Sequence, residues 1–278
     1  MNHLTDDIEV AGARIRFGVV EGGGDGSDLV LIHGNGAHHL WWGPVLEHLR
    51  LGRRLVMLDL SGHGDSGHRA EYRPGLWGQE VLAVMRETSS DRPVLVGHSM
   101  GGRVALSVAA DHPEQVSGLV MLDSSVRPPA RYRDHDTVTR RHNKTYATRE
   151  EILARFRLLP LQPEPPADLL VQIAENAILR TPHGWTWKYD PEALTRFRDA
   201  DIDAMAQRLT CPTAFVYGSE SVVVDSALAE YFSDVAPAPV AVHRVEGAYH
   251  HVILDAPREC AILIEEAARS FASAAERG

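Results

Sequence analysis

The sequence predicts an α/β protein with a mostly parallel central sheet and helices on both faces. Short apolar runs that end at Gly, Asp or His alternate with segments of helical spacing. Such runs, bounded by turn residues, are typical of buried parallel strands, and their alternation with helices indicates βαβ units. The expected strands are residues 29–33, 55–59, 94–97, 118–123, 214–217 and 240–245, and the expected helices are residues 78–88, 101–111 and 257–272.

The composition indicates a protein without nucleic-acid or membrane partners. A formal net charge of −10 lacks the basic surface that phosphate binding needs. No stretch approaches the roughly 20 apolar residues that span a bilayer, and residues 1–10 lack the apolar run of a signal peptide. Cys211 and Cys260 have no close-spaced companions, as is usual in a reducing compartment. We therefore expect a cytoplasmic protein.

The alternation of strands and helices stops in the middle of the chain. We interpret residues 127–208 as a mostly helical cap inserted over one end of the sheet, and residues 1–126 and 209–278 as the core. A separate domain or a disordered linker is the alternative. Three aromatic residues favour a packed element over a linker: Trp185, Trp187 and Phe197.

A candidate nucleophile lies between an expected strand and an expected helix. Residues 97–101 read Gly-His-Ser-Met-Gly, the pattern G-x-S-x-G with Ser99 at its centre. The serine of this motif sits on a strained turn, which requires small flanking residues and exposes the hydroxyl above the sheet. The following helix points its N-terminus at the site, which favours negative charge there.

Three further motifs occur in order along the chain. Residues 33–36 read His-Gly-Asn-Gly, residues 59–66 read Asp-Leu-Ser-Gly-His-Gly-Asp-Ser, and residues 247–250 read Gly-Ala-Tyr-His, seven residues before Pro257. Together with G-x-S-x-G, these motifs resemble those of the α/β-hydrolase family over nearly the whole chain. The resemblance implies the α/β-hydrolase fold.

The resemblance also assigns roles to individual residues. Ser99 would be the nucleophile and His250 its general base, while the backbone N–H groups of Asn35 and Met100 would form the oxyanion hole. The offset to the proline favours His250 over the neighbouring His251. Three other histidines are interpreted as structural residues of turns and loops: His33, His63 and His98.

A catalytic triad also contains an acid that orients the histidine, and the position of this acid departs from the common pattern of the family. Many relatives place an aspartate three residues after the glycine that ends the seventh strand, and here Ser221 occupies that position after Gly218. Asp123 ends the strand after the nucleophile helix, where some relatives place their acid. We therefore assign Asp123, and Glu220 and Asp225 remain the alternatives.

The substrate pocket is expected between the carboxyl edge of the sheet and the insertion. The candidate lining residues are His38, Trp41, Trp185, Trp187 and His251. They indicate an apolar or aromatic substrate of moderate size. As alternatives, Trp41 packs the first helix onto the sheet, and the two tryptophans of the insertion form the core of the insertion itself.

The leading functional hypothesis is hydrolysis of a carboxylic ester or related acyl compound through an acyl-enzyme on Ser99. Cofactor-free oxygenolytic ring cleavage or a lyase reaction with the same triad is the first alternative, and a non-catalytic small-molecule binder is the second. No metal-ligand spacing such as H-E-x-x-H occurs, so no metal and no cofactor are expected. A monomer or a homodimer would suit this reading.

Overall fold

The structure of the protein, a computed structural model, describes residues 5–24, 26–49, 52–132, 143–193 and 197–275. The first four residues of the chain, and residues 133–142 and 194–196 of the expected insertion, lie outside the described residues.

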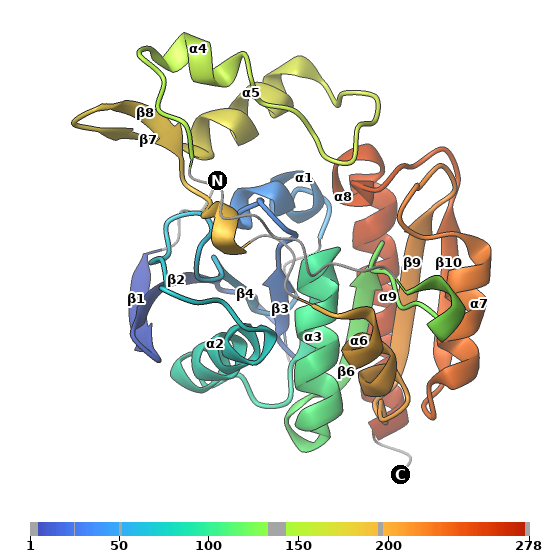
Figure 1. Cartoon of the computed structure of the whole chain (residues 1–278). Coiled ribbons are helices and arrows are strands. Elements are labelled where there is room, and N and C mark those ends of the chain that lie inside the picture. The colour runs from blue at the N-terminus through green and yellow to red at the C-terminus, as the bar shows by residue number, and fades with distance from the viewer. Residues whose placement is uncertain (1–4, 25, 50–51, 133–142, 194–196, 276–278) are drawn as a thin grey trace.

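Within the described residues, eight strands form one sheet in the order β1-β2-β4-β3-β5-β6-β9-β10 (Figure 1). The six strands from β4 to β10 in this order are parallel, and all six predicted strands are confirmed. The strands are β1 (Asp6–Val10), β2 (Ala13–Val20), β3 (Leu29–Ile32), β4 (Leu55–Leu58), β5 (Val94–His98), β6 (Gly118–Leu122), β9 (Thr213–Gly218) and β10 (Val240–Val245).

Helices cover both faces of the sheet, as the sequence predicts. One face carries α2 (Pro74–Glu87), α3 (Met100–Asp111), α6 (Asp199–Ala206) and α7 (Ser226–Val235). The other carries α1 (Gly43–Leu46), α8 (Val252–Asp255) and α9 (Pro257–Ala275). Short 3-10 turns include η1 (His39–Trp42), η2 (Pro113–Gln115), η3 (Pro129–Arg131) and η4 (Pro191–Ala193).

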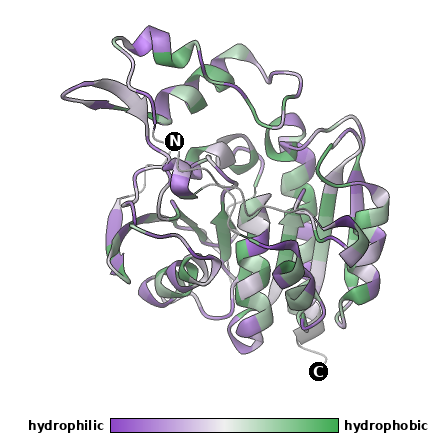
Figure 2. Ribbon diagram, in the orientation of Figure 1, coloured by the Kyte–Doolittle hydropathy of each residue, from purple (hydrophilic) through white to green (hydrophobic). Residues whose placement is uncertain are grey.

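The strands divide their side chains between two hydrophobic cores. In β3, Val30 and Ile32 join the core under α2 and α3, whereas Leu29 and Leu31 join the core under α9. This division follows from the two-residue period of a strand. Because both faces are covered, every β3 side chain is apolar and buried, and Figure 2 shows hydrophobic residues gathered in the inner strands.

Two antiparallel strands at one edge were not predicted from the sequence. Strand β1 pairs with β2, and β2 pairs antiparallel with β4. In β2, Ala13, Ile15 and Phe17 are buried, whereas Arg14 and Arg16 are not. The edge hairpin is therefore built from alternating residues, which differ from the continuous apolar runs of the central strands.

The chain between β6 and β9 contains strands as well as helices. Helices α4 (Arg149–Leu153) and α5 (Ala167–Asn176) and the hairpin of β7 (Ile178–Thr181) and β8 (Gly184–Trp187) lie beyond the carboxyl edge of the sheet (Figure 1). The expectation of a mostly helical segment did not anticipate the hairpin. Helix α6, at the end of the predicted range, packs instead on α3 beside the sheet. Leu158 and Ile173 join the core that also holds Trp41 and Trp42.

The two ends of this segment are tied together where they leave and rejoin the core. Nε of the buried Arg127 lies 3.6 Å from Oδ2 of Asp199, and Nη2 of Arg103 on α3 lies 3.4 Å from Oδ1 of the same carboxylate. The hydroxyl of Tyr132 donates to Oδ2 of Asp203 at 2.7 Å. These contacts, which we call the neck, join residues 127–132 to α6.

Both cysteines are buried and free. Among the described helices, none combines the length and the apolar character that crossing a bilayer would require.

Helix α3 approaches the sheet closely at Gly101. A Cβ atom on this residue would lie 2.2 Å from the carbonyl oxygen of Ile32 and 2.5 Å from that of His33. Both are backbone atoms, so they cannot move away by a change of side-chain rotamer. The close approach places the N-terminus of α3 against the end of β3.

We expect Gly101→Ala to lower the free energy of unfolding by about 1–3 kcal/mol, the usual cost of forcing extra volume into a packed interior. Gly75→Ala is the matched control, because Gly75 lies in α2 and its Cβ would meet no atom within 4 Å. It should be neutral or stabilise the protein by up to about 1 kcal/mol. Urea unfolding measures both, and equal destabilisation would contradict the contact at Gly101.

Candidate active site

Ser99 lies on a strained turn between β5 and α3. Its φ is +53°, which is uncommon for a residue other than glycine and is concentrated at functional sites. The Ser99 N–H donates to the carbonyl oxygen of Leu122 at 2.9 Å, which ties the turn to β6. A Cβ on Gly97 would lie 2.4 Å from the backbone of Gly101, so the turn has no space for a larger residue. The structure thus gives Ser99 the geometry of a nucleophile elbow.

His33 ties the loop after β3 to the loop after β4. Nε2 of the fully buried ring accepts the Leu60 N–H at 3.0 Å, so the proton is on Nδ1, which donates to the carbonyl oxygen of Gly34 at 2.8 Å. A Cβ on Gly34 would lie 3.3 Å from Cβ of Ser99. His33 therefore joins two loops at the carboxyl edge, in line with the structural role expected from the sequence.

The buried carboxylate of Asp59 fixes the same two loops. Oδ1 accepts the backbone N–H of His39 at 2.8 Å and contacts its Nδ1 at 3.0 Å, while Oδ2 accepts the N–H of Asp65 at 2.8 Å. Burial by itself would raise the pKa of Asp59, but the hydrogen bond and charge of His39 hold it below its usual range. Asp59 is therefore a charged anchor beneath the loop that contains Asn35.

Asn35 and Met100 are the expected oxyanion donors. Met100 follows Ser99 directly. Asn35 follows Gly34, on which a Cβ would lie 3.3 Å from Cβ of Ser99. Asn35 lies in a tight turn that the N–H of Ala37 closes on the carbonyl oxygen of Gly34 at 3.2 Å. Met100 is the first residue of α3, where backbone N–H groups point out of the helix. This end of the helix favours negative charge next to Ser99.

His250 and Asp123 form a buried pair, as the sequence predicts. Nδ1 of His250 lies 2.8 Å from Oδ1 of Asp123, and the exposed fractions of the two side chains are 5% and 0%. Ser221 donates its hydroxyl proton to the same Oδ1 at 2.7 Å, since its oxygen already accepts the N–H groups of Val223 and Val224. The serine that replaces the usual acid is thus a hydrogen-bond donor to Asp123, a role that the sequence did not reveal.

The two alternative acids lie elsewhere. Glu220 is exposed, and its carboxylate accepts the hydroxyl of Ser219 at 3.1 Å. Asp225 is also exposed, caps α7 by accepting the Leu228 N–H at 2.9 Å, and pairs with Arg131 at 2.8 Å. The structure therefore brings Asp123, and neither alternative, to the imidazole of His250.

Three histidines cluster around the serine turn. Nε2 of His98 donates to the carbonyl oxygen of His250 at 2.9 Å, which holds the backbone of that residue. The ring centroids of His250 and His251 are 4.9 Å apart. One ring nitrogen from each of His98, His250 and His251 lies within 4.8 Å of the others, which makes this cluster a candidate metal site. A cation bound there would occupy the imidazole of His250 itself.

The expected pocket residues fall into two groups. Trp41 contacts His251 at a ring-centroid distance of 5.2 Å, and Nε2 of the buried His38 donates to the carbonyl oxygen of Ile173 on α5 at 3.1 Å. These three residues therefore lie between the core and the segment above it. Trp185 and Trp187 are in β8. The ring centroids of Trp187 and Phe156 are 6.1 Å apart, so Trp187 packs within the segment itself, which was the alternative to lining the pocket.

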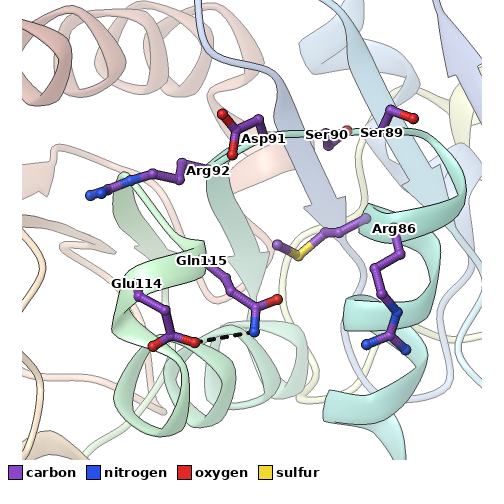
Figure 3. A pocket seen from close by; sticks show the side chains of 8 residues that line it. Arg86, Ser89, Ser90, Asp91, Arg92, Glu114 and Gln115 are labelled. Atoms are coloured by element: carbon purple, nitrogen blue, oxygen red, sulfur yellow. Dashed lines mark hydrogen bonds between the residues drawn. The ribbon is translucent and has the colours of Figure 1, made fainter.

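A separate hollow lies at the opposite edge of the sheet. Its volume is about 290 Å³, and its lining includes Met85 at the end of α2, Arg92 before β5 and Gln115 before β6 (Figure 3). Ligands of open α/β sheets bind at the carboxyl ends of the strands. This hollow is at the amino ends and is not part of the candidate site.

The fold and site define an α/β enzyme with a serine elbow and a buried His–Asp pair. The family model for the alpha/beta hydrolase fold matches residues 29–257, and the chain belongs to this family.

Curated relatives of this chain include esterases, and a solved structure of low identity shares its fold. The chain is 30% identical to Esterase Rv0045c of Mycobacterium tuberculosis over 92% of this chain and 91% of that protein. It is 28% identical to the pimeloyl-[acyl-carrier protein] methyl ester esterase of Vibrio cholerae over 88% of this chain and 96% of the relative. The thioesterase domain from the curacin biosynthetic pathway superposes with a TM-score of 0.76 at 20% identity, covering 93% of this chain and 98% of that one.

Buried histidines make the stability of this protein depend on pH. Burial lowers the pKa of His38 to about 4 and the pKa values of His63 and His98 to about 3. The unfolded chain, with histidine pKa values near 6.5, takes up protons that the folded state does not. The unfolding free energy should therefore be fully retained above about pH 6.5 and fall as the pH drops towards 4.

His63→Gln tests this dependence, because each buried histidine adds a slope of up to about 1.4 kcal/mol per pH unit in that window. Urea unfolding between pH 7.5 and 4.5 should show a flatter dependence for His63→Gln than for the wild type. His183→Gln, which changes an exposed histidine, should leave the slope as it is. Parallel curves for the wild type and His63→Gln would contradict the role of burial.

Proposed function

We propose that this protein is a serine esterase that cleaves carboxylic esters through an acyl-enzyme on Ser99. The observation that carries the proposal is the buried contact of 2.8 Å between Nδ1 of His250 and Oδ1 of Asp123. The carbonyl oxygen of His250 accepts from His98, the residue before Ser99, whose φ is positive. Esterases among the curated relatives support the same reaction class.

The hydrogen bond to Asp123 determines which nitrogen of His250 acts as the base. A carboxylate only accepts, so Nδ1 holds the proton and Nε2 presents its lone pair. The same carboxylate also accepts the Ser221 hydroxyl at 2.7 Å and the Gly218 N–H at 3.0 Å, which hold it in place beside His250. Asp123 in turn stabilises the imidazolium that forms when His250 takes a proton.

The reaction then follows the two halves of acyl transfer. His250 removes the proton of the Ser99 hydroxyl as its oxygen attacks the ester carbonyl, and the negative oxygen is bound by the N–H groups of Met100 and Asn35. Collapse of the intermediate transfers the proton from His250 to the departing alcohol. Water, deprotonated by His250, attacks the acyl-enzyme, and release of the carboxylic acid restores Ser99.

The surroundings of the proposed base support an apolar or aromatic substrate of moderate size. His251 lies beside His250 and is itself in contact with Trp41, and the exposed fractions of His251 and Trp41 are 4% and 6%. Apolar walls with few polar groups are typical of small-molecule sites and exclude water from the reacting ester.

We expect Ser99→Ala to fold normally and to hydrolyse p-nitrophenyl esters at least about 10⁴-fold more slowly than the wild type, since the nucleophile is removed. Steady-state kinetics with esters of graded chain length measure this, and a fluorophosphonate probe located by mass spectrometry should label Ser99. Ser226→Ala, at an exposed serine of α7, is the control. A folded wild type that neither turns over esters nor accepts the probe would point to triad-based deprotonation or to a binder instead.

We expect Asp123→Asn to lower kcat by roughly 10³- to 10⁴-fold, because an amide neither orients His250 correctly nor stabilises its charge. The same change of a carboxylate to an amide in Glu220→Gln should keep kcat within about twofold, as Glu220 is exposed. Kinetics on one p-nitrophenyl ester compare the two. Loss of activity in Glu220→Gln with a fully active Asp123→Asn would reverse the assignment of the acid.

A further inference from the structure

One side chain of the segment between β6 and β9 reaches the turn that contains His250. Gln162 is half-buried, although its neighbours Leu161 and Pro163 are exposed, and Leu161 exposes 74% of its surface. The loop therefore turns a single polar side chain inwards.

The amide of Gln162 bridges two groups of the histidine turn. Its Nε2 donates to the carboxylate of Asp255, 2.9 Å from Oδ1 and 3.1 Å from Oδ2, and its Oε1 accepts the N–H of His251 at 3.0 Å. The partners fix the orientation of the amide, because a carboxylate only accepts and a backbone N–H only donates.

These contacts hold the backbone on both sides of His250. Oδ2 of Asp255 accepts the N–H of Tyr249, the residue before His250, at 2.9 Å. Gln162 accepts the N–H of His251, the residue after His250. Gln162 and Asp255 are themselves joined, so the two N–H groups are held by one connected unit. His98 holds the carbonyl oxygen between them. Only Gln162 among these partners comes from the segment beyond the sheet.

We propose that Gln162 is a positioning residue through which this segment sets the place of His250. The inference rests on the proposed function, since it concerns the base of that reaction. Displacing the loop breaks the bonds of Gln162 and leaves the Asp255 carboxylate and the His251 N–H without this partner. A buried donor or acceptor left without a partner destabilises that arrangement, so the turn relaxes and the imidazole moves from its productive place. Such a shift lowers kcat, whereas the ground-state affinity for the ester is untouched.

Two replacements of Gln162 remove different parts of the bridge. Gln162→Met keeps the length of the side chain but removes donor and acceptor, and kcat should fall about 10- to 100-fold at unchanged KM. Gln162→Glu places a second carboxylate against Asp255, and kcat should fall further. Leu161→Ala, at the exposed neighbour in the same loop, should retain the kcat of the wild type.

The decisive variant combines Gln162→Glu with Asp255→Asn. This exchange moves the carboxylate to position 162 and the amide to position 255. The amide at position 255 can donate to the carboxylate at position 162, and both backbone N–H groups, of Tyr249 and His251, keep an oxygen acceptor. We expect kcat to recover to within about threefold of the wild type. The rate of fluorophosphonate labelling at Ser99 should follow kcat through the whole series.

Outcomes for this inference and for the proposed function are separable. If Gln162→Met and Gln162→Glu both keep the kcat of the wild type and are labelled at Ser99 at the wild-type rate, the role of Gln162 is overturned. An equal fall in Leu161→Ala, a rise in KM alone, or failure of the exchanged pair to recover would also overturn it. A wild type that is not labelled at Ser99 would instead overturn the acyl-enzyme mechanism.

Discussion

The rest of the site depends on the hydrogen bonds that the buried carboxylate of Asp123 accepts. Asp123 follows β6 at a φ of +47°, and its N–H donates to the carbonyl oxygen of Val216 on β9 at 2.7 Å. Its oxygens receive bonds from Gly218 and Ser221 at the end of β9 and from His250 after β10. A buried charge is tolerated only when such bonds replace those of water. The loops after β9 and β10 are therefore both bonded to one carboxyl group.

The strands were predictable from the sequence where burial on both faces of the sheet requires a continuous run of apolar residues. Strand β3 and residues 94–97 of β5 are buried on both faces, so each of these residues is apolar or small. Strand β2 lacks such a run because Arg14 and Arg16 alternate with buried residues. The hairpin of Ile178–Thr181 and Gly184–Trp187 was also missed, since strands of four residues with partly buried side chains are too short to establish a period.

The candidate site was predictable where its geometry is local. A strand-to-helix turn requires small residues around Ser99, and this requirement is visible within five residues of sequence. The bond from Ser221 to Asp123 joins residues 98 apart, and that from Gln162 to Asp255 joins residues 93 apart. A serine after a strand or a glutamine among prolines carries no local mark of such a partner. Only the folded chain reveals them.

The neck described above separates the sheet from the chain that lies beyond it. Arg127 and Tyr132 leave the core beside Asp199 and Asp203, where the chain returns, so the two ends of the segment meet at neighbouring points on α3 and α6. Lengthening a loop between fixed ends costs little, because its closure entropy grows only with the logarithm of its length. The length of the segment can therefore change at little cost to the folding of the sheet, provided that Gln162 keeps its contacts with the turn of His250.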